Sequence, residues 1–172
     1  MYVISWNWHC SKMNNTKKLI FYDRRELACL LKKKSMQGKI IVFTNGCFDI
    51  LHRGHLSYLN KAKKLGDILV VGLNTDRSVR KIKGDKRPYN KEKDRAFVLA
   101  HIKPVDYVCL FDEPTPARLI RSIRPSILVK GGDYKDHEIV GAKDVKGWGG
   151  KVIILPYIKG CSTTRLIKKI KE

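Results

Sequence analysis

Residues 44–55 read TNGCFDILHRGH, and this stretch decides the fold because it joins an apolar run to an amphipathic segment. The run that leads into it, residues 39–44 (KIIVFT), is typical of a strand buried on both faces. The segment that follows, residues 55–65, repeats apolar residues at helical spacing and is stopped by Gly66. A loop that leaves a buried strand and opens a helix is a common phosphate site, since the helix N-terminus attracts anions.

Strands and helices alternate along the rest of the chain. Further strands are expected at residues 67–73, 105–111, 126–129 and 151–155, and helices at residues 23–34, 91–102, 116–123 and 162–171. Such alternation favours parallel strands joined by right-handed crossovers. We therefore expect a Rossmann-like, doubly wound α/β sheet of about five parallel strands with helices on both faces. Ligands of such sheets bind outside the carboxyl ends of the strands, where the strand order switches.

The length of 172 residues suits one domain with a sizeable core. Residues 1–16 are polar with scattered aromatics and no clear period, so we expect a loosely ordered N-terminal extension before a domain at residues 17–172. No apolar run approaches the ~20 residues that span a bilayer, and the N-terminus lacks the order of features of a signal peptide. None of the five cysteines forms a CxxC pair, which favours reduced thiols and a cytoplasmic protein.

The formal net charge of +20 is large for this length, and it results from 36 Lys and Arg against 16 Asp and Glu. Such an excess indicates polyanionic partners: nucleotides, phosphorylated substrates, nucleic acid or an anionic membrane surface. Runs such as residues 32–34 and 168–169 lie near expected helix ends, where the simpler interpretation is a solvated face that also complements the helix dipole.

His52 and His55 are three residues apart, so they project from the same side of the expected helix start. Gly54 between them removes a side chain that would obstruct phosphates, and Gly46 allows the backbone a tight path. Two imidazoles placed there can donate hydrogen bonds to phosphate oxygens as charge develops. A zinc site is disfavoured, because only Asp49 is near enough in sequence to serve as a third ligand. Neither a P-loop nor a GxGxxG string occurs.

Six blocks of the sequence, in order, carry a resemblance to a known family. They are TNGCFDILHRGH (44–55), KLGD (64–67), LNTD (73–76), KGDKRPYN (83–90), LVKGGDYK (128–135) and GCSTT (160–164). From about Lys39 to the C-terminus the chain resembles the HxGH cytidylyltransferase-like superfamily, and within it the D-glycero-D-manno-heptose 1-phosphate adenylyltransferases. The resemblance implies that ATP and heptose 1-phosphate give ADP-heptose, a precursor for lipopolysaccharide or surface glycans, and pyrophosphate. Because no sugar-kinase half is present, the stand-alone form of the family is expected.

The resemblance also implies roles for particular residues of the nucleotidyltransferase domain. The expected catalytic residues are His52, His55 and Lys81; the nucleotide would be bound by Asn45, Gly46, Cys47, Phe48, Gly54, Lys83, Gly131, Asp133, Ser162, Thr163 and Thr164, and the acceptor by Asp49, Arg87 and Arg118. Lys81 and Lys83, in a basic loop at residues 81–88, would hold the two phosphorylated substrates together. Mg²⁺ would arrive with ATP, and Asp133 either helps to hold it or is an ordinary turn residue. Arg95 matches the family, whereas the Glu usual two residues before it is replaced by Lys93, with Glu92 adjacent.

Two alternatives remain open at this stage. A glycerol-3-phosphate cytidylyltransferase would keep the chemistry, but residues 83–88 and 129–135 argue against it, and Tyr157 stands where related cytidylyltransferases carry a nucleotide-binding Arg. A non-catalytic nucleic-acid-binding module would explain the charge, yet the basic residues do not interleave with aromatics as they do on single-strand binding surfaces. We therefore expect no nucleic-acid partner and no membrane insertion. Relatives suggest a homodimer.

Overall fold

The structure, a computed structural model, describes residues 19–132, 138–156, 163 and 166–167. Six parallel strands in this part of the chain form one sheet in the order β1-β4-β3-β2-β5-β6. Their bounds are β1 (Ile20–Phe21), β2 (Ile41–Gly46), β3 (Ile68–Asn74), β4 (Tyr107–Phe111), β5 (Ile127–Gly131) and β6 (Lys151–Leu155). The predicted Rossmann-like sheet is confirmed. The addition is β1, whose two residues are too few to give a sequence pattern.

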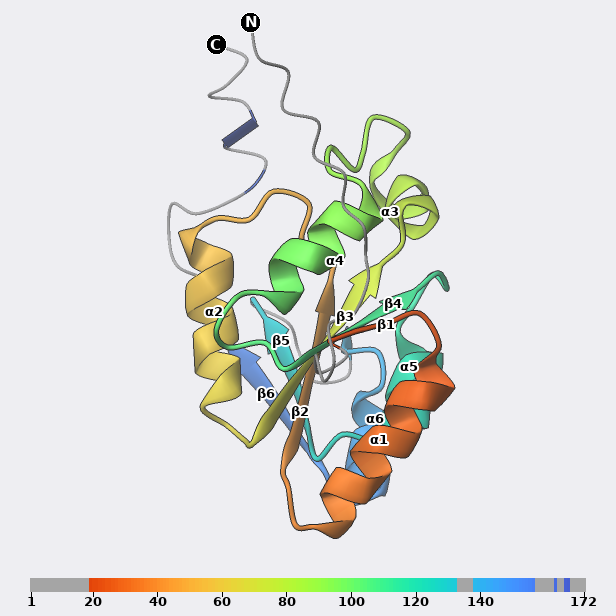
Figure 1. The fold of residues 1–172 in the computed structure, drawn as a ribbon, viewed down its shortest axis with the longest axis vertical. Helices are drawn as coiled ribbons and strands as arrows, with labels where there is room; N and C mark the ends of the chain where they lie inside the picture. Colours follow the sequence, from red (N-terminus) through yellow and green to blue (C-terminus); the bar gives the residue numbers. More distant parts are fainter. Residues whose placement is uncertain (1–18, 133–137, 157–162, 164–165, 168–172) are drawn as a thin grey trace, which may run out of the picture.

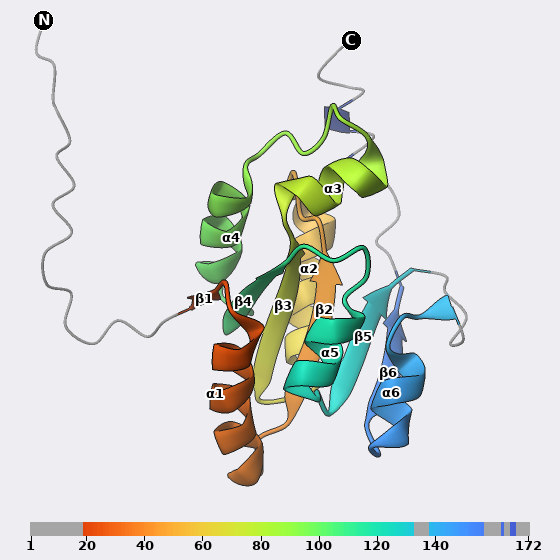
Figure 2. The same ribbon diagram turned by 90° about the vertical axis from the view of Figure 1, so that its right-hand side faces the viewer.

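Helices cover both faces of this sheet, as Figures 1 and 2 show. Their bounds are α1 (Arg24–Met36), α2 (Arg53–Lys63), α3 (Asp76–Lys83), α4 (Glu92–Ala100), α5 (Ala117–Ile123) and α6 (Ala142–Gly147). Apolar side chains of α1, α5 and α6 pack in one cluster on one face, and those of α2 and α4 pack in a second cluster on the other face. None of the helices described is long and apolar enough to cross a membrane.

Helix starts follow the capping residues that the sequence offers. The Oδ1 atom of Asp23 accepts a hydrogen bond of 2.8 Å from the backbone N–H of Arg25, which confirms the acidic cap predicted for the first helix. The hydroxyl of Thr75 accepts one of 3.2 Å from the N–H of Ser78 and caps α3. Most of the helix predicted at residues 162–171 lies outside the described residues.

The main error in the predicted elements concerns residues 76–83. We predicted a basic loop that begins at Lys81, but Lys81 and Lys83 lie in the last turn of the helix α3. Its sequence, DRSVRKIK, has only two apolar residues, and its buried side chains are Ser78 and Val79, so it lacks the apolar stripe that reveals a helix. The six-residue helix α6 was not predicted either.

The strand order places a switch point at β2. From β2 the sheet continues through β3 and β4 on one side and through β5 and β6 on the other. The carboxyl ends of β2 and β5 therefore border the crevice where ligands of such sheets bind. The sequence stretch at residues 44–55 leaves the sheet at this point and leads into α2 (Figure 2).

Candidate active site

A cavity of about 650 Å³ opens at the carboxyl ends of β2, β3 and β5. This volume falls in the range of small-molecule sites, roughly 300–1,000 Å³. Twelve of the predicted site residues line it: Asn45, Gly46, Cys47, Phe48, Asp49, His52, Gly54, His55, Lys83, Arg87, Gly131 and Thr163. The structure thus brings together most of the nucleotide-binding and catalytic residues that the sequence indicated.

The two histidines form one wall of the cavity at the start of α2. Their rings are stacked, with centroids 3.9 Å apart, and the ring of Phe48 lies 5.4 Å from that of His55. His52 caps the helix with extended backbone but makes no side-chain capping bond, and the first turn holds no acidic residue. An uncompensated helix N-terminus attracts anions. The Nδ1 atoms of both rings are buried without a hydrogen-bond partner among the described residues.

Both histidine rings favour the neutral form at pH 7. Burial, the neighbouring His52 ring and the charge of Lys83 lower the pKa of His55 to about 4. Burial also lowers the pKa of His52. A neutral imidazole still carries one N–H that can donate to a phosphate oxygen. The approach of a negatively charged substrate would favour protonation, so the pair is suited to respond to charge on a ligand.

Asp49 holds a loop in place at the cavity. Its carboxylate accepts hydrogen bonds from Arg87 Nε at 2.7 Å and from the backbone N–H groups of Tyr89 and Asn90 at 2.8 and 3.0 Å. The side chain of Asp49 is almost completely buried. We predicted that Asp49 and Arg87 bind the acceptor. In the structure they bind each other, and their contact with substrate stays a prediction.

Arg95 is hydrogen-bonded to the segments around the Asp49 loop. Its guanidinium donates to Cys47 O at 2.5 Å, to Asn90 O at 3.0 Å and to Asp76 Oδ1 at 2.7 Å, and the residue is buried. Glu92 accepts a hydrogen bond of 2.7 Å from the backbone N–H of Asp76 at the start of α3. The substitution at position 93 therefore leaves this arrangement intact, because the neighbouring Glu92 supplies a carboxylate to α3.

Lys81 and Arg118 are not brought to the cavity. Lys81 lines a separate hollow of about 520 Å³ beside Thr75 and Asp112. Residues two apart on a helix point to different sides, so Lys83 faces the cavity while Lys81 does not. Arg118 is exposed on α5 and is not among the residues that line the cavity. The catalytic role of Lys81 and the substrate role of Arg118 stay predictions that this geometry does not favour.

Three further predicted residues, Asp133, Ser162 and Thr164, lie outside the described residues. Thr163, between the last two, donates its hydroxyl to Ile50 O at 3.2 Å and lines the cavity. The segment that contains the GCSTT block thus reaches the site through at least this residue.

Sequence reasoning missed seven of the residues that line the cavity, among them Lys130 and Tyr58. Lys130, at the end of β5, lines the cavity and donates to the Oδ1 atom of Asn45. Tyr58, on α2, donates to Val129 O at 3.1 Å, and its hydroxyl lies 2.7 Å from that of Thr44. The sequence held two signals for Lys130: it is a basic residue inside an apolar strand run that ends at two glycines, and it lies in the LVKGGDYK block.

Cys47 is not an activated nucleophile. Burial raises the pKa of its thiol despite the nearby positive charges of Lys83, Arg95 and Arg87, so it stays protonated at pH 7. Cys47 is thus a half-buried, neutral thiol at the cavity; Cys161 lies outside the described residues.

Residues 43–169 match the cytidylyltransferase-like family. The chain belongs to this family. Membership makes it a nucleotidyltransferase, the class of enzyme predicted from residues 44–55. The cavity, with the paired histidines at a helix N-terminus, is the candidate nucleotide site.

Two curated proteins are about half identical to this chain. The bifunctional protein HldE of Geobacter metallireducens is 52% identical over 144 residues, which are 84% of this chain and 29% of that protein. The bifunctional protein HldE of Nitratiruptor sp. is 50% identical over 150 residues, 87% of this chain and 32% of that protein. The chain therefore spans about a third or less of the length of these relatives.

A solved structure is similar as well. The lipopolysaccharide core biosynthesis protein from Thermoplasma volcanium GSS1 is 32% identical, with a TM-score of 0.59. The match covers 72% of this chain and all of that protein. Both kinds of comparison agree with the resemblance that the six sequence blocks indicated.

Proposed function

We propose that the chain transfers the AMP part of ATP to D-glycero-D-manno-heptose 1-phosphate and yields ADP-heptose and pyrophosphate. The observation that carries this proposal is the pair His52 and His55 at a helix N-terminus that opens into a cavity of about 650 Å³. The buried Nδ1 atoms of both rings have no hydrogen-bond partner among the described residues. The relatives named HldE and the lipopolysaccharide core biosynthesis protein support the sugar-nucleotide branch of the family.

The chemistry requires alignment and charge stabilisation rather than a protein nucleophile. An oxygen of the acceptor phosphate attacks the α-phosphorus in line, a new P–O bond forms, and the bond to the β-phosphate oxygen breaks as pyrophosphate leaves. The acceptor oxygen is already anionic, so no general base is needed. His52 and His55 donate hydrogen bonds to the phosphate oxygens as negative charge develops, and Lys83 adds a positive charge at the edge of the cavity.

Mg²⁺ fits this scheme as a part of the substrate MgATP. In the described residues no three His, Cys, Asp or Glu side chains gather in a way that could hold a metal ion. The carboxylate of Asp49 is already engaged by Arg87 and two backbone N–H groups. The phosphates of ATP and water would supply its ligands, which is common for this cation, with Asp133 as the candidate protein ligand. Bound in this way, the ion neutralises triphosphate charge.

One screen tests the proposal against its nearest alternative. ATP and CTP are each combined with heptose 1-phosphate, other sugar 1-phosphates and glycerol 3-phosphate, and pyrophosphate release is measured. We expect turnover with ATP and heptose 1-phosphate to exceed every other pair. Faster turnover with CTP and glycerol 3-phosphate would instead establish the cytidylyltransferase alternative, and no release with any pair would refute both.

The cellular setting follows from the same proposal. The product would feed lipopolysaccharide or surface-glycan assembly, and the reaction would take place in the cytoplasm, where ATP is available. We propose a homodimer as the working form, without a nucleic-acid partner. Sedimentation at several protein concentrations checks the dimer, and a single monomeric species at all of them contradicts it.

A further inference from the structure

Asn45 and Lys130 meet in the lining of the cavity. Asn45 lies at the end of β2 and Lys130 at the end of β5, and these two strands are neighbours on either side of the switch point. The Nζ atom of Lys130 donates to the Oδ1 atom of Asn45, and both residues line the cavity. Neither the histidine pair nor the loop held by Asp49 contributes to this contact.

The pair belongs to the wall opposite the histidines. Side chains alternate between the two faces along a strand. On the face covered by α2, Val42 and Val129 join the same apolar cluster, and Thr44 contacts Tyr58 of α2. Phe43 and Leu128 belong to the cluster on the other face. By this alternation Asn45 and Lys130 project to the face away from α2, so the site has a histidine wall and a lysine wall.

Among the described residues, the ammonium of Lys130 has a hydrogen-bond partner but no negatively charged partner. Burial lowers the pKa of Lys130 to about 8. Because this value is still above 7, most Lys130 side chains are protonated and positively charged at pH 7. A lysine ammonium has three N–H donors, and the amide oxygen of Asn45 accepts one of them. Lys130 forms no ion pair with any carboxylate of the described residues. A half-buried cation with spare donors is stabilised when an anion enters the cavity.

The geometry of in-line displacement indicates which phosphate, that of the acceptor or those of the nucleotide, lies next to Lys130. The attacking and leaving oxygens lie on opposite sides of the α-phosphorus. The helix N-terminus and the histidine wall offer the groups that favour the triphosphate and its leaving pyrophosphate. The acceptor phosphate must then approach from the opposite side, where Lys130 supplies the positive charge.

We propose that Lys130, held in place by Asn45, binds the phosphate of the acceptor substrate. This inference rests on the proposed function and adds to it a residue that selects a phosphorylated acceptor. Lys130 touches substrate in this scheme, whereas Asn45 is a positioning residue that aims the ammonium.

The test separates acceptor binding from nucleotide binding. Lys130→Met keeps the length of the side chain and removes its charge, Lys130→Arg keeps the charge, and Lys143→Met removes an exposed lysine of α6 as the matched control. For each variant the KM of heptose 1-phosphate and the KM of ATP are measured separately. Binding of heptose 1-phosphate is also measured by calorimetry on enzyme saturated with an unreactive ATP analogue, so that a variant without turnover still reports.

We expect Lys130→Met to raise the KM and the dissociation constant of heptose 1-phosphate by about 10-fold to 100-fold, as for the loss of a charged hydrogen bond. The KM of ATP should change by less than about 3-fold, and Lys130→Arg should recover most of the loss. Asn45→Ala should give a smaller effect in the same direction. Lys143→Met should match the wild type.

Three outcomes overturn the inference. They are unchanged acceptor binding in Lys130→Met, a loss confined to ATP, and an equal loss for both substrates. Failure of the proposed function has a different signature, because the wild-type chain would then release no pyrophosphate from ATP with any sugar 1-phosphate. Thermal unfolding of each variant verifies that it is folded before its constants are compared.

Discussion

At the scale of single residues, the arrangement of the histidine pair destabilises the folded protein but favours the binding of phosphate. Two rings with centroids 3.9 Å apart cannot both be charged without repulsion, and burial opposes the charge further. Both effects favour a neutral pair, whose two buried Nδ1 atoms lack partners among the described residues. Buried polar atoms without partners are uncommon and destabilising. A phosphate in the cavity would supply acceptors for this wall and favour positive charge on it.

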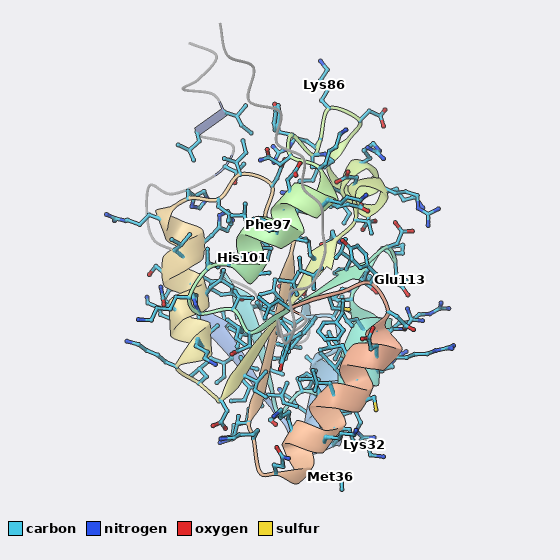
Figure 3. The ribbon with its side chains drawn as sticks, in the orientation of Figure 1. Lys32, Met36, Lys86, Phe97, His101 and Glu113 are labelled. Carbon is cyan, nitrogen blue, oxygen red and sulfur yellow. The ribbon has the colours of Figure 1, made fainter. Side chains whose placement is uncertain are left out.

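The first prediction concerns the rate of the reaction. His55→Ala should lower kcat by about 10²–10³, the usual loss when one donor to developing charge is removed. The fold should persist, because His55 contacts Phe48 and His52 at the edge of the core rather than its centre. His101→Ala is the matched control, since His101 is the exposed residue that follows α4 and lies next to Phe97 (Figure 3).

Steady-state rates and thermal unfolding of both variants check this prediction. Activity of His55→Ala close to that of the wild type would refute the proposed role. An equal loss in His101→Ala would show that the assay responds to something other than the cavity.

The second prediction follows from the pKa of His55. The unfolded chain takes up a proton on this ring near pH 6.5, whereas the folded chain does so only near pH 4, so protons favour unfolding between these values. The contribution of His55 to the free energy of unfolding should be fully present above about pH 6.5 and should be lost as the pH is lowered towards about 4. The carboxylate of Asp67, whose pKa is lowered by the N–H of Ile40 and by Lys39, acts only at lower pH.

Urea unfolding at several pH values between about 4.5 and 7.5 measures this dependence. In His55→Asn the decline of the unfolding free energy should be shallower than in the wild type, because the titrating ring is gone. Parallel curves for the two proteins would contradict the assignment to His55.

At the scale of secondary-structure elements, Arg95 is the residue that joins the parts of the site. From α4 it reaches the loop after β2 through Cys47, the loop at Asn90, and the start of α3 through Asp76. Asp49 reaches the loop before α4 in turn through Arg87. The cavity is thus bordered by segments that are distant in sequence and are joined through two buried charged residues.

The third prediction tests this arrangement. Arg95→Met should destabilise the protein by about 3–5 kcal/mol, because it breaks a buried ion pair and leaves the carboxylate of Asp76 and two carbonyls without their donor. Arg77→Met removes an ion pair with Asp112 in which the arginine is 70% exposed, and it should cost less than about 1 kcal/mol.

Chemical denaturation of the two variants gives both values. Similar costs for the two substitutions would mean that burial does not set the value of these pairs. If Arg95→Met is stable enough to assay, its KM for ATP should also rise, because the loop at Cys47 borders the cavity.

At the scale of the whole molecule, the sequence predicts what depends on patterns and misses what depends on single residues. The apolar runs at residues 39–44 and 67–73 identified β2 and β3, and the spacing of His52 and His55 correctly placed both on one wall. The helix α3 was hidden because so few of its residues are apolar, and this concealed that Lys81 and Lys83 point apart.

The lysine wall shows why part of the site cannot be predicted from the sequence. Lys130 is one basic residue at the end of an apolar strand, and its partner Asn45 lies 85 positions away in the sequence. Only the pairing of β2 with β5 brings them together. No local pattern encodes a contact that the strand order creates.

In the part of the chain that the structure describes, exposed lysines lie far from the cavity as well as near it. Lys32 on α1 and Lys86 in the loop after α3 lie at opposite ends of the molecule and are exposed (Figure 3). Charges of one sign destabilise a compact state by mutual repulsion. Because the Debye length falls from about 10 Å at 0.1 M salt to about 3 Å at 1 M, added salt should relieve this repulsion.

The last prediction is therefore that Tm rises between about 0.05 and 0.5 M NaCl, by about 2–4 °C for each kcal/mol of repulsion removed. Screening of exposed ion pairs such as that of Arg77 with Asp112 opposes the rise only weakly. Combined substitution of Lys86, Lys103 and Lys143 by Glu lowers the net charge without touching the cavity or the last turn of a helix, so it should raise Tm at low salt and reduce the response to salt. A Tm that falls with salt, or a triple variant that responds as the wild type does, would show that repulsion among the surface lysines does not limit stability.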